Sequence, residues 1–254
     1  MSKVIPLRPK SAARPAEGAI ETRANRRLQG SLAQKFALQI LKGDLPEGHC
    51  FPGEVELAAQ MGISRSVLRE AFRILTSKGL VEGRPKAGTR VCPRRQWSLL
   101  DPDLLAWQFE AQPSRKFLRH LFELRLIVEP GAAALAATRR THAQLARMEA
   151  ALNAMAEHGL ATEEGRVADQ RFHLEMLEAT SNEAILALSS TILSAIAWTT
   201  IFKQRKRKLP RDPVPDHLAL FKAIKAGNAE GAREAMADLV RLALADTEFS
   251  LEED

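Results

Sequence analysis

The sequence predicts a mainly α-helical protein of two domains, a small N-terminal domain with a β-hairpin and a C-terminal all-α bundle. Length is the first observation, because 254 residues suffice for two ordinary domains. Periodicity is the second, since apolar residues recur about every 3.6 positions from residue 101 onward. Charge is the third. Residues 1–97 hold 18 Lys and Arg against 8 Asp and Glu, whereas the remaining 157 residues hold 19 against 23.

The composition excludes several protein classes. With 45% hydrophobic and 27% charged residues, the chain has the balance of a soluble globular protein. No apolar run reaches the roughly 18 residues needed to span a membrane, and the N-terminal stretch lacks a secretory segment. We therefore expect a cytoplasmic protein with no membrane partner. The two cysteines, Cys50 and Cys92, lack the spacing of a disulfide framework or a cysteine zinc site.

The first domain is expected to follow a basic arm. Residues 1–29 are rich in Pro, Ala and Arg and show no hydrophobic period, which predicts a disordered arm. A helix is expected over 31–42 and a short helix over 54–61. Gly62 then separates the short helix from a longer basic one, which Ser64 is placed to cap.

A small hairpin is expected to follow the longer helix, which spans 64–78. Two short β-prone pieces, 80–81 and 89–91, flank a turn rich in Gly, Pro and Lys. Two helices joined by a tight glycine turn, followed by a hairpin, form the pattern of a winged helix-turn-helix. The domain is predicted over 30–92, with a linker over 93–100.

The longer helix carries the first candidate site. A helix of this kind fits the major groove of DNA and presents its N-terminal residues to the base edges. Those residues are Ser64, Arg65, Ser66 and Arg69, and the hairpin tip at 84–88 adds cations suited to phosphate or minor-groove contact. The pattern alone is also compatible with an ordinary three-helix subdomain that has a solvated basic face.

The second domain is predicted to be all-α over 101–249. Thr141 and Gln144 have the form of a capping box at the start of one of its helices. The expected helices span 101–110, 114–138, 142–158, 163–180, 182–206, 214–226 and 228–249.

Asp169 and His173 are the second candidate site. They lie four residues apart in a predicted helix, so their side chains project from one face, and His217 could add a second imidazole from a later helix. One carboxylate and two imidazoles suit Zn²⁺, Ni²⁺ or Mn²⁺, with positions left for water or a ligand carboxylate. From the residues alone, a surface pair or a satisfied pair without metal is the ordinary interpretation, since such pairs arise often by chance.

The run FPGEVELAAQMGISRSVLREAFRILTSKGLVEGRPKAGTRV resembles the winged-helix DNA-binding domain of the GntR superfamily. That resemblance implies DNA contacts by Arg65 and Arg69 and wing contacts by Lys86 and Gly88. Some relatives carry an arginine where this chain has Val55, so that contact is not implied and the operator sequence cannot be transferred.

The second domain resembles the FCD effector-binding domain. The residues that carry this resemblance are FELRLIVEPGAAALAA, the Asp-x3-His of Asp169 and His173, Asn182 at the start of the next helix, and HLALFKAIKAGNAEGAREAM. RQWSLLDPDLLAW and LRLIVEPGAAALAATR point to its sugar-acid-responsive branch. Relatives have a fourth metal ligand, a histidine, at the position of Leu239. Leucine cannot ligate, so three alternatives follow: three protein ligands with water or the effector completing the site, a reduced affinity for the metal, or loss of the metal.

Three further residues are predicted to contact the effector. Arg125 matches an arginine often found in the pocket of FCD domains, and its fork suits bidentate capture of a carboxylate. The alternative is an exposed arginine on an amphipathic helix. Asn182 follows from the same resemblance. Trp198 could pack against a ligand or belong to the core.

Together these features predict a ligand-responsive transcriptional regulator. We expect a homodimer that binds a double-stranded DNA operator and represses a sugar-acid (galactonate-like) catabolic operon until a small carboxylate effector relieves it. A non-specific or architectural DNA-binding protein with a helical oligomerisation domain is the alternative. An enzyme is not expected, because a metal-dependent hydrolase needs a general base, and Glu175 points to a different face of the helix from His173.

Overall fold

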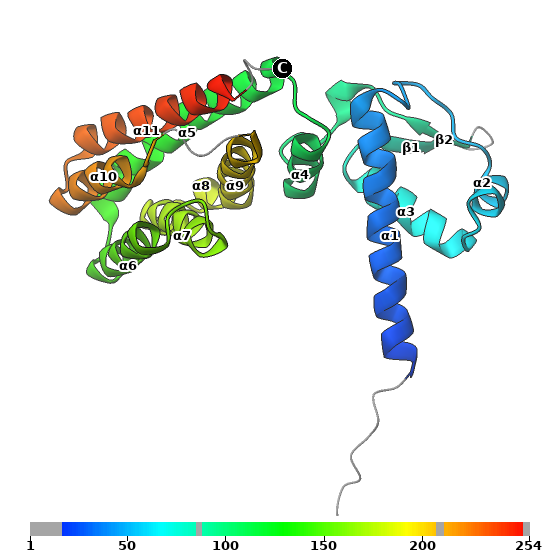
Figure 1. Cartoon of the computed structure of the whole chain (residues 1–254), viewed down its shortest axis with the longest axis horizontal. Helices are drawn as coiled ribbons and strands as arrows, with labels where there is room; N and C mark the ends of the chain where they lie inside the picture. The colour runs from blue at the N-terminus through cyan, green and yellow to red at the C-terminus, as the bar shows by residue number, and fades with distance from the viewer. Residues whose placement is uncertain (1–16, 85–87, 207–210, 251–254) are drawn as a thin grey trace, which may run out of the picture. The chain divides into compact units, whose positions relative to one another are not determined.

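The computed structural model of the chain describes residues 17–84, 88–206 and 211–250 (Figure 1). The chain divides between Trp97 and Ser98 into two compact units, and this break falls within the segment 93–100. The first unit contains three helices and a two-stranded antiparallel sheet, and the second contains helices alone among its described residues.

The first unit is a winged helix-turn-helix. Its helices pack around a cluster of three aromatic rings, Phe36, Phe51 and Phe72, whose centroids lie 5.1 to 5.8 Å apart. Strand β1 pairs with β2 in the register Val81↔Val91. The elements are α1 (Glu17–Lys42), α2 (Glu54–Met61), α3 (Arg65–Ser77), β1 (Val81–Arg84), β2 (Gly88–Val91) and the 3-10 turn η1 (Arg94–Gln96).

Helix α1 begins earlier than the sequence analysis predicted. The disordered arm expected over 1–29 is wrong for residues 17–29, which are helical, and residues 1–16 lie outside the described residues. Pro15 is the last proline before the helix. The stretch EGAIETRANRRL that follows is made mostly of residues with high helix propensity, so local propensity sustains the helix without a hydrophobic stripe.

The turn between α2 and α3 has the expected chemistry. Gly62 adopts a left-handed conformation (φ +64°) at the end of α2, where a side chain would be strained. Ser64 caps α3, and its hydroxyl accepts a hydrogen bond from the backbone N–H of Val67. Both signals were read correctly from the sequence, and together they fix where the exposed N-terminal end of α3 begins.

The second unit is a bundle of helices that confirms the mainly α-helical class. The predicted capping box of Thr141 and Gln144 is present. The helices are α4 (Pro102–Glu110), α5 (Arg115–Arg139), α6 (His142–His158), α7 (Glu163–Ala179), α8 (Glu183–Leu186), α9 (Ser189–Lys206), α10 (Val214–Ala226) and α11 (Ala229–Phe249).

The single helix expected over 182–206 is wrong, because it is divided into α8 and α9. At the break the N–H of Leu188 bonds to the carbonyl of Ile185, three residues back, and α9 restarts at Ser189. The sequence there is Ser189-Ser190-Thr191, and such hydroxyl residues compete for backbone hydrogen bonds and favour helix ends.

The packing of the bundle encloses one face of α7. Helix α11 lies along α5, α6 lies along α7, and α7 also contacts α5 and α9 (Figure 1). Fully buried residues such as Phe122, Phe172 and Met236 form the core between these layers. Among the described residues, no helix is both long and apolar enough to cross a membrane.

Candidate DNA-binding helix and candidate metal centre

The N-terminal end of α3 brings four predicted DNA-contacting residues together. Arg65, Ser66 and Arg69 are exposed, whereas Val67 and Leu68 on the opposite side are buried in the core. The hydroxyls of Ser64 and Ser66 lie 3.0 Å apart. A helix end with buried apolar residues on one side and exposed polar side chains on the other is suited to lying in a DNA groove.

Arg69 is held in place by Glu54 at the start of α2. Its Nε and Nη2 atoms donate to Glu54 Oε2 at 3.2 and 3.0 Å, with the Arg69 side chain 61% exposed. Exposed ion pairs of this kind contribute at most about 1 kcal/mol, so a phosphate or base can replace the carboxylate.

Of the two predicted wing residues, only Gly88 is described. It adopts φ +78° at the start of β2 and pairs with Arg84. Lys86 lies outside the described residues. Gly88 therefore stands at the hairpin tip, in a backbone conformation that favours glycine.

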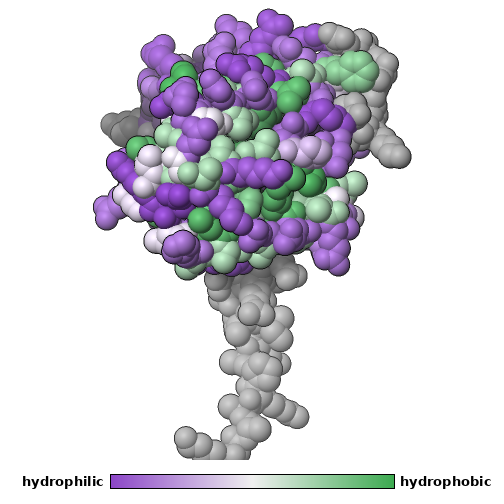
Figure 2. All heavy atoms as spheres, turned by 90° about the vertical axis from the view of Figure 1, so that its left-hand side faces the viewer, coloured by the Kyte–Doolittle hydropathy of each residue, from purple (hydrophilic) through white to green (hydrophobic). Residues whose placement is uncertain are grey.

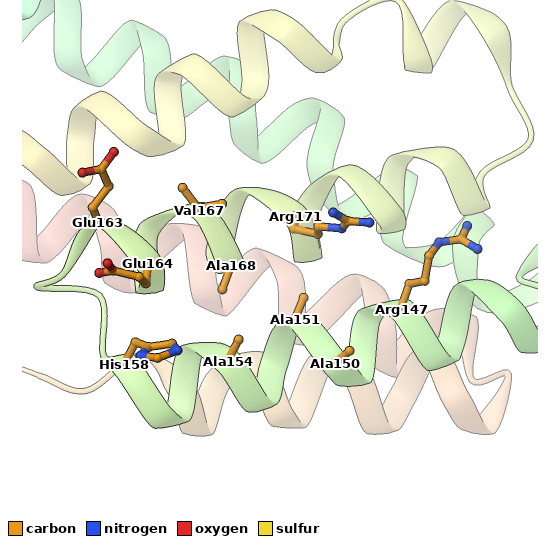
Figure 3. A pocket seen from close by; sticks show the side chains of 10 residues that line it. All are labelled: Arg147, Ala150, Ala151, Ala154, His158, Glu163, Glu164, Val167, Ala168 and Arg171. Carbon is orange, nitrogen blue, oxygen red and sulfur yellow. The ribbon is translucent and has the colours of Figure 1, made fainter.

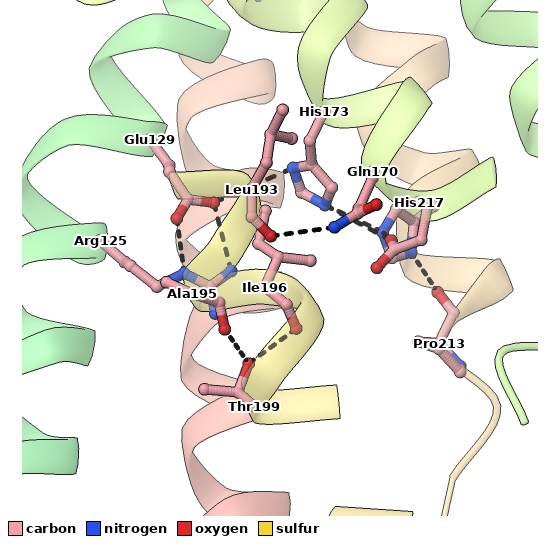
Figure 4. Close-up of polar contacts among 11 residues, drawn as sticks. Arg125, Glu129, Gln170, His173, Leu193, Ala195, Ile196, Thr199, Pro213 and His217 are labelled. Atoms are coloured by element: carbon pink, nitrogen blue, oxygen red, sulfur yellow. Dashed lines mark hydrogen bonds and ion pairs between the residues drawn. The ribbon is translucent and has the colours of Figure 1, made fainter. Parts of the chain in front are cut away.

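The second unit brings Asp169, His173 and His217 together. Asp169 and His173 belong to α7 and His217 to α10, and all three are buried, at most 3% exposed. Figure 4 shows His173 and His217 pointing toward one another. His217 Nε2 lies 3.0 Å from Asp169 Oδ1 and 3.3 Å from His173 Nε2, and His173 Nε2 lies 3.6 Å from Asp169 Oδ1. One ligand atom from each residue thus converges within 4.8 Å of the others.

One proton position in this cluster follows from its surroundings. His217 Nδ1 lies 2.9 Å from the carbonyl oxygen of Pro213, which can only accept, so Nδ1 carries the proton and the neutral ring presents a lone pair at Nε2. That lone pair faces both His173 Nε2 and Asp169 Oδ1, a buried oxygen with no hydrogen-bond partner among the described residues. With the proton of His173 on Nδ1, all three residues would present an electron pair to one point, as a divalent cation requires.

The pKa values of His173 and Asp169 are shifted so that His173 is neutral and Asp169 is ionised at neutral pH. Burial lowers the pKa of His173 to about 4, which keeps the imidazole neutral at physiological pH and able to ligate. Burial alone would raise the pKa of Asp169, but the neighbouring His217 and His173 hold it below its ordinary value. Asp169 is therefore a carboxylate at neutral pH.

Arg125 is buried beside this cluster and not on the surface. Its Nε donates to Glu129 Oε1 at 2.5 Å and its Nη2 to Glu129 Oε2 at 3.3 Å, and Glu129 is fully buried. Glu129 Oε2 also lies 4.0 Å from His173 Nδ1. The alternative that Arg125 is a solvated surface residue is therefore wrong, but its charge is already neutralised by Glu129 (Figure 4).

A small cavity of about 40 Å³ joins these groups. Leu239 lies in its wall, at the position where the family resemblance implies a fourth ligand, and Lys203 and Arg211 add two cations. Its lining residues include Arg125, Asp169, His173, Thr199, Thr200, Lys203, Arg211, Pro213, His217, Leu239 and Asp246.

Asn182 and Trp198 do not line this cavity. Asn182 caps α8, and its Oδ1 accepts hydrogen bonds from the backbone N–H groups of Ala184 and Ile185. Trp198 is half-buried and packs against an apolar cluster that includes Phe109 and Phe202. Both residues thus lie outside the cavity beside Asp169, His173 and His217, and their contact with an effector stays a prediction.

Sequence reasoning missed three residues of this region, namely Glu129, Lys203 and Arg211. Glu129 carried a signal, because it follows Arg125 by four residues and such a pair shares one helix face. Lys203 begins the basic run 203–208, and cations that precede a proline at 210 predict a solvated helix end. For Lys203 this prediction is wrong, because the residue is only 8% exposed.

Comparison with known proteins identifies the family. Residues 28–91 match the gntR family of bacterial regulatory proteins, and residues 120–242 match the FCD domain. The galactonate operon transcriptional repressor of Escherichia coli (strain K12) is 33% identical over 204 residues, which cover 80% of this chain and 89% of that protein. The chain belongs to the GntR family and carries an FCD domain.

Other relatives agree with this assignment. YieP, an uncharacterized HTH-type transcriptional regulator of E. coli (strain K12), is 34% identical over 80% of this chain and 93% of its own length. The solved structure of Lar from Listeria monocytogenes shares the fold, with a TM-score of 0.58 at 18% identity, over 87% of this chain and 97% of that one. The GntR-family chain is thus a transcriptional regulator and not an enzyme, as predicted.

Proposed function

We propose that this GntR-family regulator binds a small carboxylate in the FCD cavity, through a divalent metal on Asp169, His173 and His217. Ligand binding then changes the affinity of a homodimer for a double-stranded DNA operator. Similarity to the galactonate operon repressor supports a repressor of a sugar-acid operon that the ligand relieves. The observation that carries this proposal is the convergence of three buried potential ligand atoms within 4.8 Å of one another. Beside them lies Lys203, a buried cation with no hydrogen bond or ion pair to another described residue.

The three ligands indicate which metals could bind and leave one coordination position for water or the effector. One carboxylate oxygen and two imidazole nitrogens suit Zn²⁺, Ni²⁺ or Mn²⁺. When bound, the metal supplies a positive centre that attracts a ligand carboxylate or hydroxyl. Leu239 in the cavity wall cannot ligate, so a coordination position remains for water or the effector.

Lys203 is the cation best placed to bind the ligand's negative charge. Arg125 is paired with Glu129, and Arg211 is paired with Asp216 and Asp246. Lys203 lines the cavity and makes no hydrogen bond or ion pair with another described residue. Isolated buried charge is costly, and an anionic ligand would offset that cost.

Lys203 also remains charged at neutral pH. Burial lowers its pKa to about 8, which still leaves most of the ammonium protonated at pH 7. We therefore assign the binding of the effector's carboxylate to Lys203. Arg125, for which the sequence predicted that role, pairs with Glu129 beside the cavity.

The cavity volume suggests how binding is transmitted. About 40 Å³ accommodates little more than water, so a sugar acid must displace side chains of α9, α10 or α11. A ligand that binds one arrangement of these helices better than another shifts the population of the two arrangements. That shift is the physical basis we propose for a response at the DNA-binding units.

A calorimetric titration tests the ligand site. Galactonate and lactate are titrated into zinc-loaded and chelator-treated full-length chain, with Lys203→Met and the exposed-site control Lys222→Met alongside. We expect binding to the zinc-loaded chain only, at least about tenfold weaker in Lys203→Met, with unchanged zinc stoichiometry. Equal affinity of Lys203→Met and Lys222→Met would contradict the role of Lys203.

A second titration tests regulation. Operator fragments selected from a random duplex library are titrated with the regulator in the presence and absence of a panel of sugar acids. The proposal predicts a ligand-dependent change in operator affinity. Equal affinity for every duplex, with a salt dependence of phosphate contacts alone, would instead support the non-specific DNA-binding alternative.

A further inference from the structure

The two candidate imidazole ligands differ in what their second ring nitrogen contacts. His217 Nδ1 has the carbonyl oxygen of Pro213 as its acceptor, at 2.9 Å. His173 Nε2 lies 3.3 Å from His217 Nε2, but its Nδ1 is buried and has no hydrogen-bond partner among the described residues. A neutral imidazole carries its proton on one nitrogen and a lone pair on the other, so the group that accepts from Nδ1 determines whether Nε2 can ligate.

Glu129 on α5 supplies a carboxylate on the Nδ1 side of the His173 ring. Its Oε2 lies 4.0 Å from His173 Nδ1, and Figure 4 shows the two side chains pointing toward one another. A shift of about 1 Å by either side chain would bring these atoms to hydrogen-bond length. A carboxylate can only accept, so a bond between them requires the His173 proton on Nδ1.

Arg125 holds this carboxylate in place. Its Nε donates to Glu129 Oε1 at 2.5 Å and its Nη2 to Oε2 at 3.3 Å, so Oε2 is the more weakly bonded oxygen. Each carboxylate oxygen has two lone pairs, and Oε2 can therefore accept from His173 as well. Hydrophilic side chains cover much of the molecular face in Figure 2, where water solvates them. Glu129 is fully buried, so bulk water does not compete for its oxygens.

We propose that Glu129 is a positioning residue of the metal site, whose Oε2 accepts the Nδ1 proton of His173 and thereby directs the Nε2 lone pair into the cluster. Histidines that bind a metal almost always donate their other ring nitrogen to a carboxylate or carbonyl oxygen. Loss of such an acceptor weakens metal binding about ten- to a hundredfold. This role rests on the proposed metal site, and it gives Arg125 a task other than contact with the effector.

Two double variants of the full-length chain separate the acceptor oxygen from the ion pair. The acceptor-free variant combines Arg125→Met with Glu129→Met. The amide variant combines Arg125→Met with Glu129→Gln, and it retains an oxygen in a side chain of similar size. Both variants remove both charges, which avoids the unpaired buried charge that a single substitution would leave.

Calorimetric zinc titration compares these variants with the wild type, and urea denaturation compares their stabilities. We expect the acceptor-free variant to bind zinc at least about tenfold more weakly than the wild type, and the amide variant to bind at least about threefold more tightly than the acceptor-free one. Equal zinc affinity in the two variants, or an acceptor-free variant as tight as the wild type, would overturn the proposal and leave the metal site standing. A wild type that binds no zinc would overturn both.

A buried acid elsewhere on α7 provides the matched control. Glu175 is 4% exposed and accepts from Arg147 Nε at 2.8 Å, and Arg147 borders an open groove between α6 and α7 (Figure 3). Glu175 follows His173 by two positions, so it projects from a different face of the helix. Arg147→Met combined with Glu175→Met should therefore leave zinc affinity unchanged. An equal loss in this control would contradict a specific role for Glu129.

Nuclear magnetic resonance detects the hydrogen bond itself. In zinc-loaded chain labelled with ¹⁵N-histidine, the Nδ1 proton of His173 should resonate downfield and exchange slowly with water, and His173→Ala identifies its signal. The acceptor-free variant should shift this signal upfield and speed its exchange, while the Nδ1 proton of His217 stays unchanged as an internal reference. An unchanged His173 signal in the acceptor-free variant would overturn the proposal, because another group would then accept that proton.

Discussion

The N-terminal end of α3 and the Asp169–His173–His217 cluster are both built from polar side chains, but they differ in their exposure to water. Arg65 and Ser66 lie on the surface, where water solvates whatever a substitution leaves behind. The cluster residues are at most 3% exposed, where a polar group without a partner is costly. A substitution at the exposed site should therefore change only the interaction with its binding partner. A substitution at the buried site should also leave neighbouring polar groups without partners.

Because of this difference in exposure, we expect substitutions in the two units to have different effects on binding affinity and on folding stability. A substitution on the exposed face of α3 should change DNA affinity and leave stability almost unchanged. A substitution around the Asp169–His173–His217 cluster should lower the free energy of unfolding and also change the affinity for the ligand. Three variants, taken from the largest expected effect to the smallest, test this distinction.

Glu129→Ala should have the largest effect. It leaves the buried Arg125 guanidinium without its carboxylate, and the loss of one member of a buried pair costs about 3–5 kcal/mol of unfolding free energy. Urea denaturation of the full-length chain measures this cost. The control is Glu123→Ala on the exposed side of the same helix, for which about 0.5 kcal/mol or less is expected. Similar losses in the two variants would contradict the distinction.

Arg65→Ala should weaken binding without affecting the fold. We expect a loss of about 1–3 kcal/mol in affinity for a selected operator, with discrimination relaxed at one base position, since an arginine that reads a base contributes about that much. Fluorescence anisotropy measures the affinity. Arg73→Ala, further along α3, is the control. If both variants weakened all duplexes equally, Arg65 would contact phosphate and not a base.

Ser64→Ala should have the smallest effect, and this effect should be on the stability of the first unit. The variant removes the hydroxyl that accepts from Val67 N–H, which should lower the unfolding free energy of the first unit by about 1 kcal/mol. Thermal unfolding followed by circular dichroism measures the shift, with Ser77→Ala at the other end of α3 for comparison. An unchanged midpoint would contradict a stabilising role for the Ser64 cap.

Local signals account for what the sequence predicted well. Gly62, Ser64 and the Thr141–Gln144 capping box mark helix ends through interactions within a few residues, and these were read correctly. The convergence of Asp169, His173 and His217 was anticipated from helix periodicity and family resemblance.

Tertiary placement explains what the sequence could not reveal. Whether Lys203 is buried depends on the packing of α9 against α7 and α11, which no local pattern encodes. Asn182 shows the same limit, because the cap that its side chain forms on α8 was not anticipated, and its contact with the effector stays a prediction. The break between α8 and α9 was missed because continuous apolar periodicity crosses it, although its serines were a usable warning.

The central claim is that the buried cluster of the FCD unit is a metal centre, and zinc titration tests it most directly. Zn²⁺ is titrated calorimetrically into metal-free full-length chain, into His173→Ala and into the exposed-histidine control His142→Ala. The account predicts one zinc ion per chain, with affinity unchanged in His142→Ala and lowered at least about a hundredfold in His173→Ala. Equal zinc affinity in all three proteins, or no zinc binding by the wild type, would contradict it.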